Sequence, residues 1–333
     1  MMRHTFRALG TTVEMGVASS PEGLDTPSIL TACEAQIHRY EQRLSRFLPD
    51  SDVAHINRHP GEWVTVHPGT ATVVELAIEA FMATGGLFHP ALAGWLEAYG
   101  YGVSFDQVPV DSAGPPVSLP PAPADVCPVE VRRTPDQEQI CRQRLDCVQT
   151  PATASAKPSQ TPAHPRQVRV LPGWKLDLGG IGKGWIVERA ADFLRAAGLR
   201  QFVVSAGGDM VCAETKAGIP WRIRIDDPLG GAAPVLTLSV ENLAVATSGT
   251  YQRRWRQGGR EVHHILNPRT GRPAETDVVS CTVLHPRLVA AEVLAKTALI
   301  LGWQEGELWL RERAPDGWVM VSQEGKVKHS WQS

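Results

Sequence analysis

The chain has 333 residues, a hydrophobic content of 43%, a charged content of 20% and a formal net charge of −2. These values are typical of a globular protein with enough apolar material for a core, and they argue against the basic character of most nucleic-acid-binding proteins. No stretch approaches the roughly 20 consecutive apolar residues that span a bilayer, and the N-terminus lacks the apolar segment of a secretion signal.

The cysteines form no CxxC pair of the kind that binds zinc or shuttles electrons. They are scattered along the chain at Cys33, Cys127, Cys141, Cys147, Cys212 and Cys281. This spacing favours reduced thiols over a disulfide framework, so we expect a cytoplasmic protein.

Hydrophobic periodicity predicts an alternation of helices and short strands along the chain. Helices are expected at residues 28–46, 70–84, 184–197 and 290–301, and strands at 168–171, 175–178, 202–205, 221–225 and 235–240. The glycine pair Gly85-Gly86 and the single glycines Gly198 and Gly302 fit helix ends. Strands separated by single helices indicate a mixed α/β (α+β) fold class.

One interval differs in composition from the rest of the chain. Of the 26 prolines, 12 lie between residues 103 and 165, beside many Ala, Ser and Thr residues. Such a segment buries little apolar surface, so we expect much of it to be irregular or extended and to form an insertion without chemistry of its own.

The densest motif is LDLGGIGKGW at residues 176–185, where an apolar segment leads through four glycines into a helix. Glycines let the backbone approach a ligand, the helix N-terminus offers N–H groups, and Lys183 adds a positive charge. This combination suits a phosphate, although a tight turn with a solvated lysine remains the alternative. The motif is neither a Walker A loop nor GxGxxG.

Three further motifs follow it. The sequence VVSAGGDM at 203–210 ends a buried strand with two glycines and Asp209, at the edge of a sheet where ligands often bind, although GGD is also common in plain turns. The segment SGTY at 248–251 offers hydroxyl donors, while Arg253 and Arg254 after it fit either a ligand site or a solvated face. The segment HHILNP at 263–268 contains a histidine that fits a structural cap, a metal ligand or a proton shuttle.

Taken together and in this order, these motifs resemble the ApbE family of flavin transferases. The resemblance begins with LGTTVEM at 9–15, continues through LSRFLPDSDVAHIN at 44–57 and TGGLFHPALAGWLEAYGYG at 84–102, and ends with AEVLAKTALILG at 291–302. It implies one domain over residues 1–333, interrupted by the proline-rich insertion, with an ApbE-like two-lobed fold, mixed sheets and FAD bound between the lobes.

The resemblance also implies a reaction. Members of the family cleave the diphosphate of FAD, attach FMN to a Thr or Ser hydroxyl of a target protein and release AMP, with Mg²⁺ near the diphosphate. Such phosphoryl transfer depends mostly on positioning and on neutralising charge. We therefore expect FAD as substrate, Mg²⁺ as cofactor and a flavin-acceptor protein as partner.

By resemblance, Lys183 and His264 are the candidate catalytic residues, with His264 assisting deprotonation of the acceptor hydroxyl or stabilising charge. The backbone of Gly182 and the side chain of Glu292 are the candidate metal ligands. The candidate FAD-binding residues are Arg46, Phe47, Gly179, Gly180, Gly182, Lys183, Ala206, Gly207, Gly208, Asp209, Ser248, Gly249, Thr250 and His264.

The sequence departs from the family pattern at several positions. His89 stands where an Asp is usual, and Asn267 replaces an Asp before the proline of the histidine motif. On the last apolar helix, Glu292 replaces the usual Asp and Lys296 the usual Thr. Lysine has no lone pair for a metal. Either Glu292 and Lys296 form an ion pair and the ammonium replaces part of the metal's charge, or catalysis has decayed.

Two alternative functions follow from these departures. One is an FAD-binding protein with an inactive centre, and the other is an FAD diphosphatase that uses water as nucleophile and releases FMN and AMP. A dinucleotide oxidoreductase is disfavoured because no GxGxxG motif with a downstream acidic residue is present.

Overall fold

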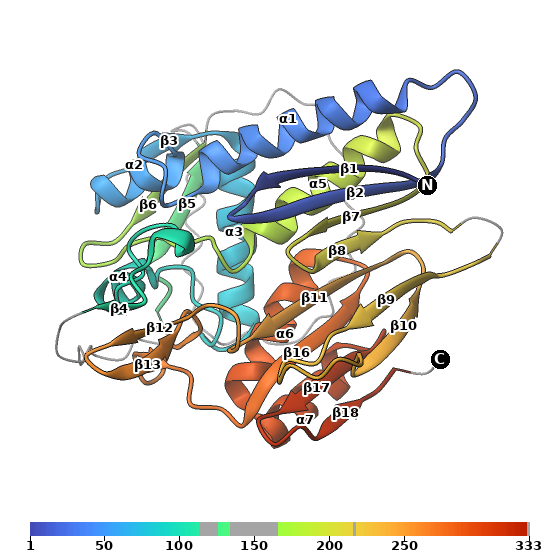
Figure 1. Cartoon of the computed structure of the whole chain (residues 1–333). Coiled ribbons are helices and arrows are strands. Elements are labelled where there is room, and N and C mark those ends of the chain that lie inside the picture. The colour runs from blue at the N-terminus through green and yellow to red at the C-terminus, as the bar shows by residue number, and fades with distance from the viewer. Residues whose placement is uncertain (113–125, 134–165, 216–217, 332–333) are drawn as a thin grey trace.

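The computed structural model describes residues 1–112, 126–133, 166–215 and 218–331 (Figure 1). Its sheets are almost entirely antiparallel, and helices are interspersed along the chain. The expected mixed α+β fold class is confirmed.

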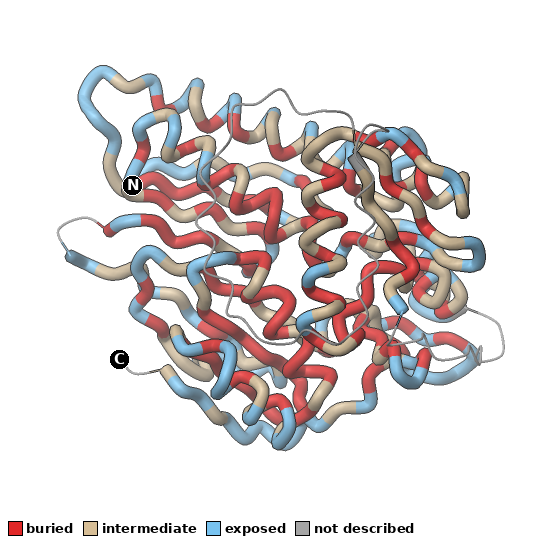
Figure 2. The backbone as a smooth tube through the Cα atoms, turned by 180° about the vertical axis from the view of Figure 1, so that it is seen from behind, coloured by how far each residue is buried: buried red, intermediate tan, exposed pale blue. Residues whose placement is uncertain are grey.

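The largest sheet has eight strands in the order β1-β2-β7-β8-β11-β16-β17-β18, and every neighbouring pair in it is antiparallel. Its strands are β1 Met2–Ala8, β2 Thr11–Ser19, β7 Gln201–Ala206, β8 Asp209–Cys212, β11 Leu243–Gly249, β16 Val278–His285, β17 Trp318–Ser322 and β18 Val327–His329. Strand β16 lies between β11 and β17 and is buried over nearly its whole length, and the buried residues of the chain lie mostly in the interior of the molecule (Figure 2).

Four helices pack along this sheet and close the main hydrophobic core. They are α1 Thr26–Leu44, α5 Gly182–Ala196, α6 Leu288–Leu301 and α7 Trp303–Arg313. Helix α6 is buried on almost every side, as expected for a helix that is hydrophobic all round. The hairpin of β9 Trp221–Ile225 and β10 Leu236–Val240 covers a separate, smaller core against the sheet.

Smaller sheets form the opposite end of the molecule (Figure 1). Their strands are β3 Val64–Val66, β4 Asp111–Ser112, β5 Val129–Arg133, β6 Arg166–Val170, β12 Arg254–Gln257, β13 Arg260–His263, β14 Leu266–Asn267 and β15 Arg272–Pro273. The accompanying helices are α2 Asp52–Arg58, α3 Pro68–Ala83, α4 Ala93–Ala98 and the 3₁₀ turn η1 Phe105–Gln107. A third core, which includes Tyr101 and Trp255, joins α4 to β12 and β13.

The four predicted helices are confirmed as α1, α3, α5 and α6, each within two residues of the expected ends. The glycines that were predicted to end helices are also confirmed in that position. Gly86 donates its N–H to the Phe81 carbonyl at 2.9 Å, and Gly302 ends α6 at a φ of 86°. Such positive φ angles are accessible to glycine without the steric cost of a Cβ.

The predicted strand at 175–178 is wrong, because only Lys175 makes a single bridge there, to Leu92. The side chain of Asn57 bonds both the N–H and the carbonyl of Leu176, at 2.6 and 2.9 Å. The Asn57 side chain therefore makes the hydrogen bonds to the Leu176 N–H and carbonyl that a neighbouring strand would make in a sheet. The alternation of buried Leu176 and Leu178 resembled a strand without being one.

The proline-rich interval is described only in part. Its described residues include η1, β4 and strand β5, which pairs with β6. The prediction for residues 113–125 and 134–165 lies outside the described residues. Within the described ranges, no helix combines the length and the apolar character needed to cross a membrane.

Candidate functional site

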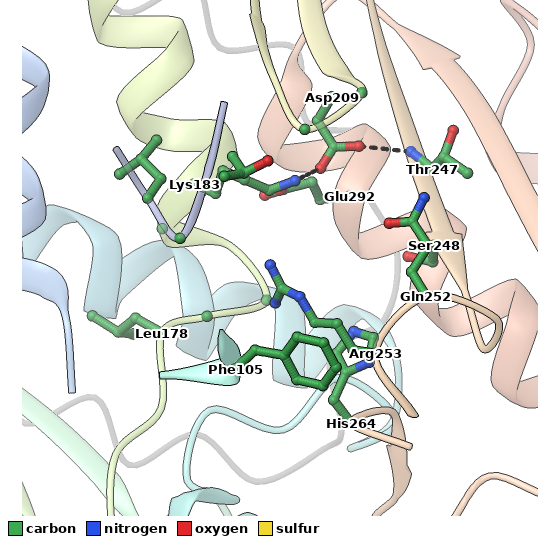
Figure 3. A pocket seen from close by; sticks show the side chains of 18 of the residues that line it. Phe105, Leu178, Lys183, Asp209, Thr247, Ser248, Gln252, Arg253, His264 and Glu292 are labelled. Atoms are coloured by element: carbon green, nitrogen blue, oxygen red, sulfur yellow. Dashed lines mark hydrogen bonds and ion pairs between the residues drawn. The ribbon is translucent and has the colours of Figure 1, made fainter. Parts of the chain in front are cut away.

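A cavity of about 800 Å³, called the main cavity below, is the centre of the candidate site. Its walls come from the loop before α5, the β7–β8 turn, strand β11, helix α6 and the segments around Phe47 and Phe105. Figure 3 shows Lys183, Asp209 and Glu292 close together on one side, with Arg253 and His264 on the other. A small cavity of about 40 Å³ adjoins the main cavity. The residues that line both cavities are Leu96, Asp177, Gly180, His264, Ile265 and Lys296.

The glycine loop forms a tight turn that starts helix α5. The Leu178 carbonyl accepts the N–H groups of Ile181 and Gly182 at 3.1 and 2.7 Å. The Asp177 carboxylate accepts the N–H of Gly179 at 2.9 Å. The helix has no side-chain N-cap at Ile181, and Gly182 and Lys183 of its first turn line the cavity, so the partial positive charge of the helix N-terminus lies at the cavity wall.

Lys183 is held by acceptors from the β7–β8 turn. Its ammonium forms an ion pair with Asp209 and donates to the Ala206 carbonyl at 3.4 Å. Asp209 also accepts the N–H of Thr247 at 2.8 Å, which ties β8 to β11 (Figure 3). Only 6% of the Asp209 side chain is exposed. A buried carboxylate with two partners fixes the direction of the lysine toward the cavity.

Glu292 lies on α6 and points to the start of α5. Its Oε2 accepts the N–H of Gly184 at 3.0 Å, and its Oε1 lies 3.9 Å from the Lys183 ammonium. A Cβ on Gly184 would displace the Glu292 carboxylate from this position and crowd Leu288. Burial and the nearby Asp209 raise the pKa of Glu292 to about 8, while Lys183 and Lys296 act against that shift.

Lys296 lies one helical turn beyond Glu292 on α6 and reaches a different part of the wall. Its Nζ contacts the position that a Cβ of Gly180 would fill, and lies 5.6 Å from the centroid of the Phe88 ring. The ion pair between Glu292 and Lys296, one of the two alternatives from the sequence, is not found, because no such pair lies within 4.0 Å in the described ranges. The Gly184 N–H holds Glu292 toward α5, whereas Lys296 extends to the glycine loop.

His264 lines both cavities and is half-buried. Burial, followed by the charges of Arg253 and Lys296, lowers the pKa of this histidine well below its usual value of 6.5. Its ring is therefore neutral at pH 7, and its buried Nδ1 has no hydrogen-bond partner among the described residues. A neutral ring with a free nitrogen can accept a proton.

An aromatic and cationic group forms the outer wall. The Arg46 guanidinium donates to the Tyr101 carbonyl at 2.7 Å and lies 4.1 Å above the Phe47 ring. Its Nε lies 3.6 Å from Asp177. These contacts hold Arg46 and Phe47 at the cavity, in the positions expected for residues beside a ring system.

Most of the predicted site residues lie at the main cavity. Those that line it are Arg46, Phe47, Gly179, Gly180, Gly182, Lys183, Gly207, Gly208, Asp209, Ser248, Gly249, His264, Glu292 and Lys296. Ala206 and Thr250 are not among the lining residues. Ala206 contributes its carbonyl to Lys183, and the buried hydroxyl of Thr250 has no partner in the described structure.

Several lining residues were not predicted from the sequence. Asp177 and Thr247 lie inside or beside predicted motifs, so proximity to those motifs was an available signal. Arg253 lines the cavity, whereas its neighbour Arg254 points away and pairs with Glu261 at 2.6 Å. Phe105 belongs to the proline-rich interval, where composition offered no signal for a site.

The two other departures from the family pattern have structural roles. His89 is buried, stacks on Trp174 with ring centroids 5.1 Å apart, and accepts the N–H of Ala91 at 3.2 Å. Asn267 accepts the N–H of Arg269 at 3.0 Å and closes a turn. Neither residue lines the main cavity.

The residues at the expected Mg²⁺ position do not fit a divalent cation. Magnesium prefers carboxylate oxygens and water in an octahedral shell. Here Glu292 is bonded to a backbone N–H, Asp209 is paired with Lys183, and Lys296 offers only donors. No group of three or more His, Cys, Asp or Glu side chains in the described part of the chain is arranged to hold a metal.

Fold and site together define an α+β protein with a cavity suited to an anionic ligand that also carries ring systems. The model of the ApbE family matches residues 9–319. An FAD:protein FMN transferase of Treponema pallidum is 29% identical, over 91% of this chain and 80% of its own length. Another from Vibrio cholerae is 27% identical, over 90% of this chain and 80% of its own length.

A solved structure agrees with these matches. The ApbE protein of Thermotoga maritima superposes with a TM-score of 0.77 at 26% identity, covering 99% of this chain and 96% of its own. The chain belongs to the ApbE family, and the resemblance found in its motifs is confirmed.

Proposed function

We propose that this protein is an FAD:protein FMN transferase, which moves FMN from FAD to a Thr or Ser hydroxyl of an acceptor protein and releases AMP. The observation that carries the proposal is the family match over residues 9–319, together with the cavity that collects the family's motifs. A volume of about 800 Å³ lies within the range of cofactor sites.

FAD would bind with its diphosphate at the glycine loop. The partial positive charge at the N-terminus of α5 and the Lys183 ammonium favour the binding of phosphate oxygens. Arg46, Phe47 and Phe105 supply faces for the ring systems. Ser248 and the backbone of Gly207, Gly208 and Gly249 supply further polar contacts.

In the reaction, the acceptor hydroxyl oxygen attacks the phosphorus of the FMN half. A new P–O bond forms, the P–O bond to the AMP phosphate breaks, and AMP leaves with the electron pair. His264 takes the hydroxyl proton, since its lowered pKa keeps the ring neutral at pH 7. Lys183 offsets the charge that develops on the phosphates.

The metal and the compartment complete the proposal. The Mg²⁺ that the family resemblance implies has no part in the proposed mechanism, because Glu292 is already bonded to the Gly184 N–H and Lys296 offers only donors. A cytoplasmic location is supported by the free thiols of Cys33, Cys127, Cys212 and Cys281. Cell fractionation tests that location.

The experiment that tests the function incubates the protein with FAD, Mg²⁺ and a flavin-acceptor domain that carries an accessible Thr. Mass spectrometry should detect the mass of FMN on the acceptor, and chromatography should detect an equal amount of AMP. Free FMN with AMP and no modified acceptor would identify an FAD diphosphatase. Bound FAD without AMP, after a second acceptor has also failed, would identify an FAD-binding protein.

His264→Ala serves as the matched variant. It should bind FAD and lose transfer by about 10²-fold or more, the usual contribution of a general base. Transfer at the wild-type rate would remove His264 from the mechanism while leaving the transferase itself in place.

A further inference from the structure

The balance of charges around the main cavity is uneven. Among the cations that line it, Lys183 is paired with Asp209, and Arg46 lies 3.6 Å from Asp177. The ammonium of Lys296 has no carboxylate within 4.0 Å in the part of the chain that the structure describes. Like the Arg253 guanidinium, which also lines the cavity, it is therefore not paired with a carboxylate of the described residues.

The position of this charge is fixed by its surroundings. Lys296 is half-buried on α6, and its Nζ fills the space beside Gly180 that any side chain at that position would occupy. The ring of Phe88 lies on its other side, with its centroid 5.6 Å from the Nζ. Burial lowers the pKa of the Lys296 ammonium, and Asp177 and Glu292 act against that shift. The lysine thus presents its charge to the glycine loop rather than to solvent.

The neighbouring carboxylates are already occupied by the protein. Glu292 accepts the N–H of Gly184 at 3.0 Å, and Asp177 accepts the N–H of Gly179 at 2.9 Å. Asp209 is shared between Lys183 and the N–H of Thr247. A divalent cation would have to displace these donors and also approach two ammonium groups, which Coulomb repulsion opposes.

We propose that the Lys296 ammonium takes the place of a divalent cation at the diphosphate of FAD, so that FAD binding in this protein does not require Mg²⁺. The inference rests on FAD being the ligand, as proposed above, and deepens that proposal. Lys296 reaches the glycine loop from α6 and adds its ammonium to that of Lys183, which Asp209 already pairs.

The test measures the Kd of FAD by quenching of flavin fluorescence, in Mg²⁺ and in EDTA. For the wild-type protein we expect the two Kd values to agree within about twofold. A Kd that rises about tenfold or more in EDTA and recovers when Mg²⁺ is added back would overturn the proposal. This comparison requires no variant, so it is independent of any folding defect.

Two variants separate charge from shape. Lys296→Met keeps the length of the side chain without its charge and should weaken FAD binding by about tenfold in both buffers. Lys296→Thr introduces a hydroxyl oxygen and should make binding depend on Mg²⁺. Lys326→Met, at an exposed lysine paired with Glu324, is the control and should bind as the wild type does. Wild-type affinity for FAD in Lys296→Met would also overturn the proposal.

The outcomes distinguish this inference from the proposed function. Metal-independent FAD binding without FMN transfer would leave the role of Lys296 intact and reject the transferase. Metal-dependent binding with transfer would reject the role of Lys296 and leave the transferase. Absence of FAD binding in either buffer would reject both.

Discussion

At the scale of single residues, the adjacent arginines Arg253 and Arg254 lie in different environments. Arg253 lines the main cavity and faces His264 and Phe105 (Figure 3), whereas Arg254 is paired with Glu261 and donates to the Thr250 carbonyl at 2.5 Å. The sequence left both arginines open between a ligand site and a solvated face. In the structure, Arg253 belongs to the ligand site and Arg254 to the exposed face.

This pair allows a matched test. Arg253→Ala removes a cation from the cavity and should raise the Kd of FAD by about tenfold, or about 1.4 kcal/mol. Arg254→Ala removes only an exposed ion pair and should leave the Kd within about twofold. Titration of both variants by flavin fluorescence makes the comparison. An equal loss in the two would contradict the assignment of Arg253 to the site.

His89 predicts a pH dependence of stability. Burial lowers the pKa of His89 from 6.5 to about 4, so between these values the unfolded chain binds a proton that the folded chain does not. Folding stability therefore falls as the pH drops through this window, by about 2 kcal/mol between pH 7 and pH 5 from this residue alone.

Urea unfolding at pH 7 and pH 5 measures the effect. His89→Gln should lose less stability than the wild type over this interval, while His329→Gln, at an exposed position on β18, should behave as the wild type does. An unchanged pH dependence in His89→Gln would mean that the pKa of His89 is not lowered in the folded protein.

At the scale of elements, the predictions from sequence were most accurate where the signal was local. The helices α1, α3, α5 and α6 followed from apolar spacing and glycine ends. The strand expected at 175–178 failed because the side chain of Asn57, 119 residues away from Leu176, satisfies that backbone. No local pattern reports such a contact.

The site shows the same difference between what local sequence patterns predict and what depends on contacts between distant residues. Its glycine loops, Asp209 and His264 could be predicted because each lies in a compact motif that the family shares. The wall formed by Tyr101 and Phe105 could not, since it depends on packing against Trp255, far along the chain. The separation of Lys296 from Glu292 also required the positions of two helices in space.

The crossing of α6 and α7 provides a stability test at this scale. A Cβ on Gly306 of α7 would collide with the carbonyl oxygen of Ala298 on α6. Gly306→Ala should therefore cost about 1–3 kcal/mol of stability through overpacking. Gly94→Ala, in helix α4 with no atom within 4 Å of the added Cβ, should be neutral or stabilise by up to about 1 kcal/mol. Thermal unfolding of both variants makes the comparison, and a stable Gly306→Ala would contradict the close helix contact.

At the scale of the whole molecule, we propose one domain over residues 1–333 in which part of the proline-rich interval is an insertion. Strands β5 and β6 are antiparallel partners, and Arg133 lies opposite Arg166. Arg133 and Arg166, which flank the segment 134–165, are therefore neighbours on two antiparallel strands, and a two-residue Asn-Gly turn can join them.

Replacing residues 134–165 with this turn should retain a single unfolding transition and change the Kd of FAD by less than about threefold. Phe105→Ala, in the part of the interval that lines the cavity, should weaken FAD binding more than the deletion does. Loss of FAD binding in the shortened chain would show that the segment belongs to the site and is not an insertion.

The central claim is that the diphosphate of FAD lies between the glycine loop at the start of α5 and the ammonium groups of Lys183 and Lys296. The most direct test is a crystal structure of the protein with FAD, grown in EDTA. We expect phosphate oxygens within hydrogen-bonding distance of the loop amides and of both lysines, with the flavin or adenine ring against the wall of Arg46, Phe47 and Phe105. Density for FAD outside the main cavity, or a diphosphate remote from both lysines, would contradict it.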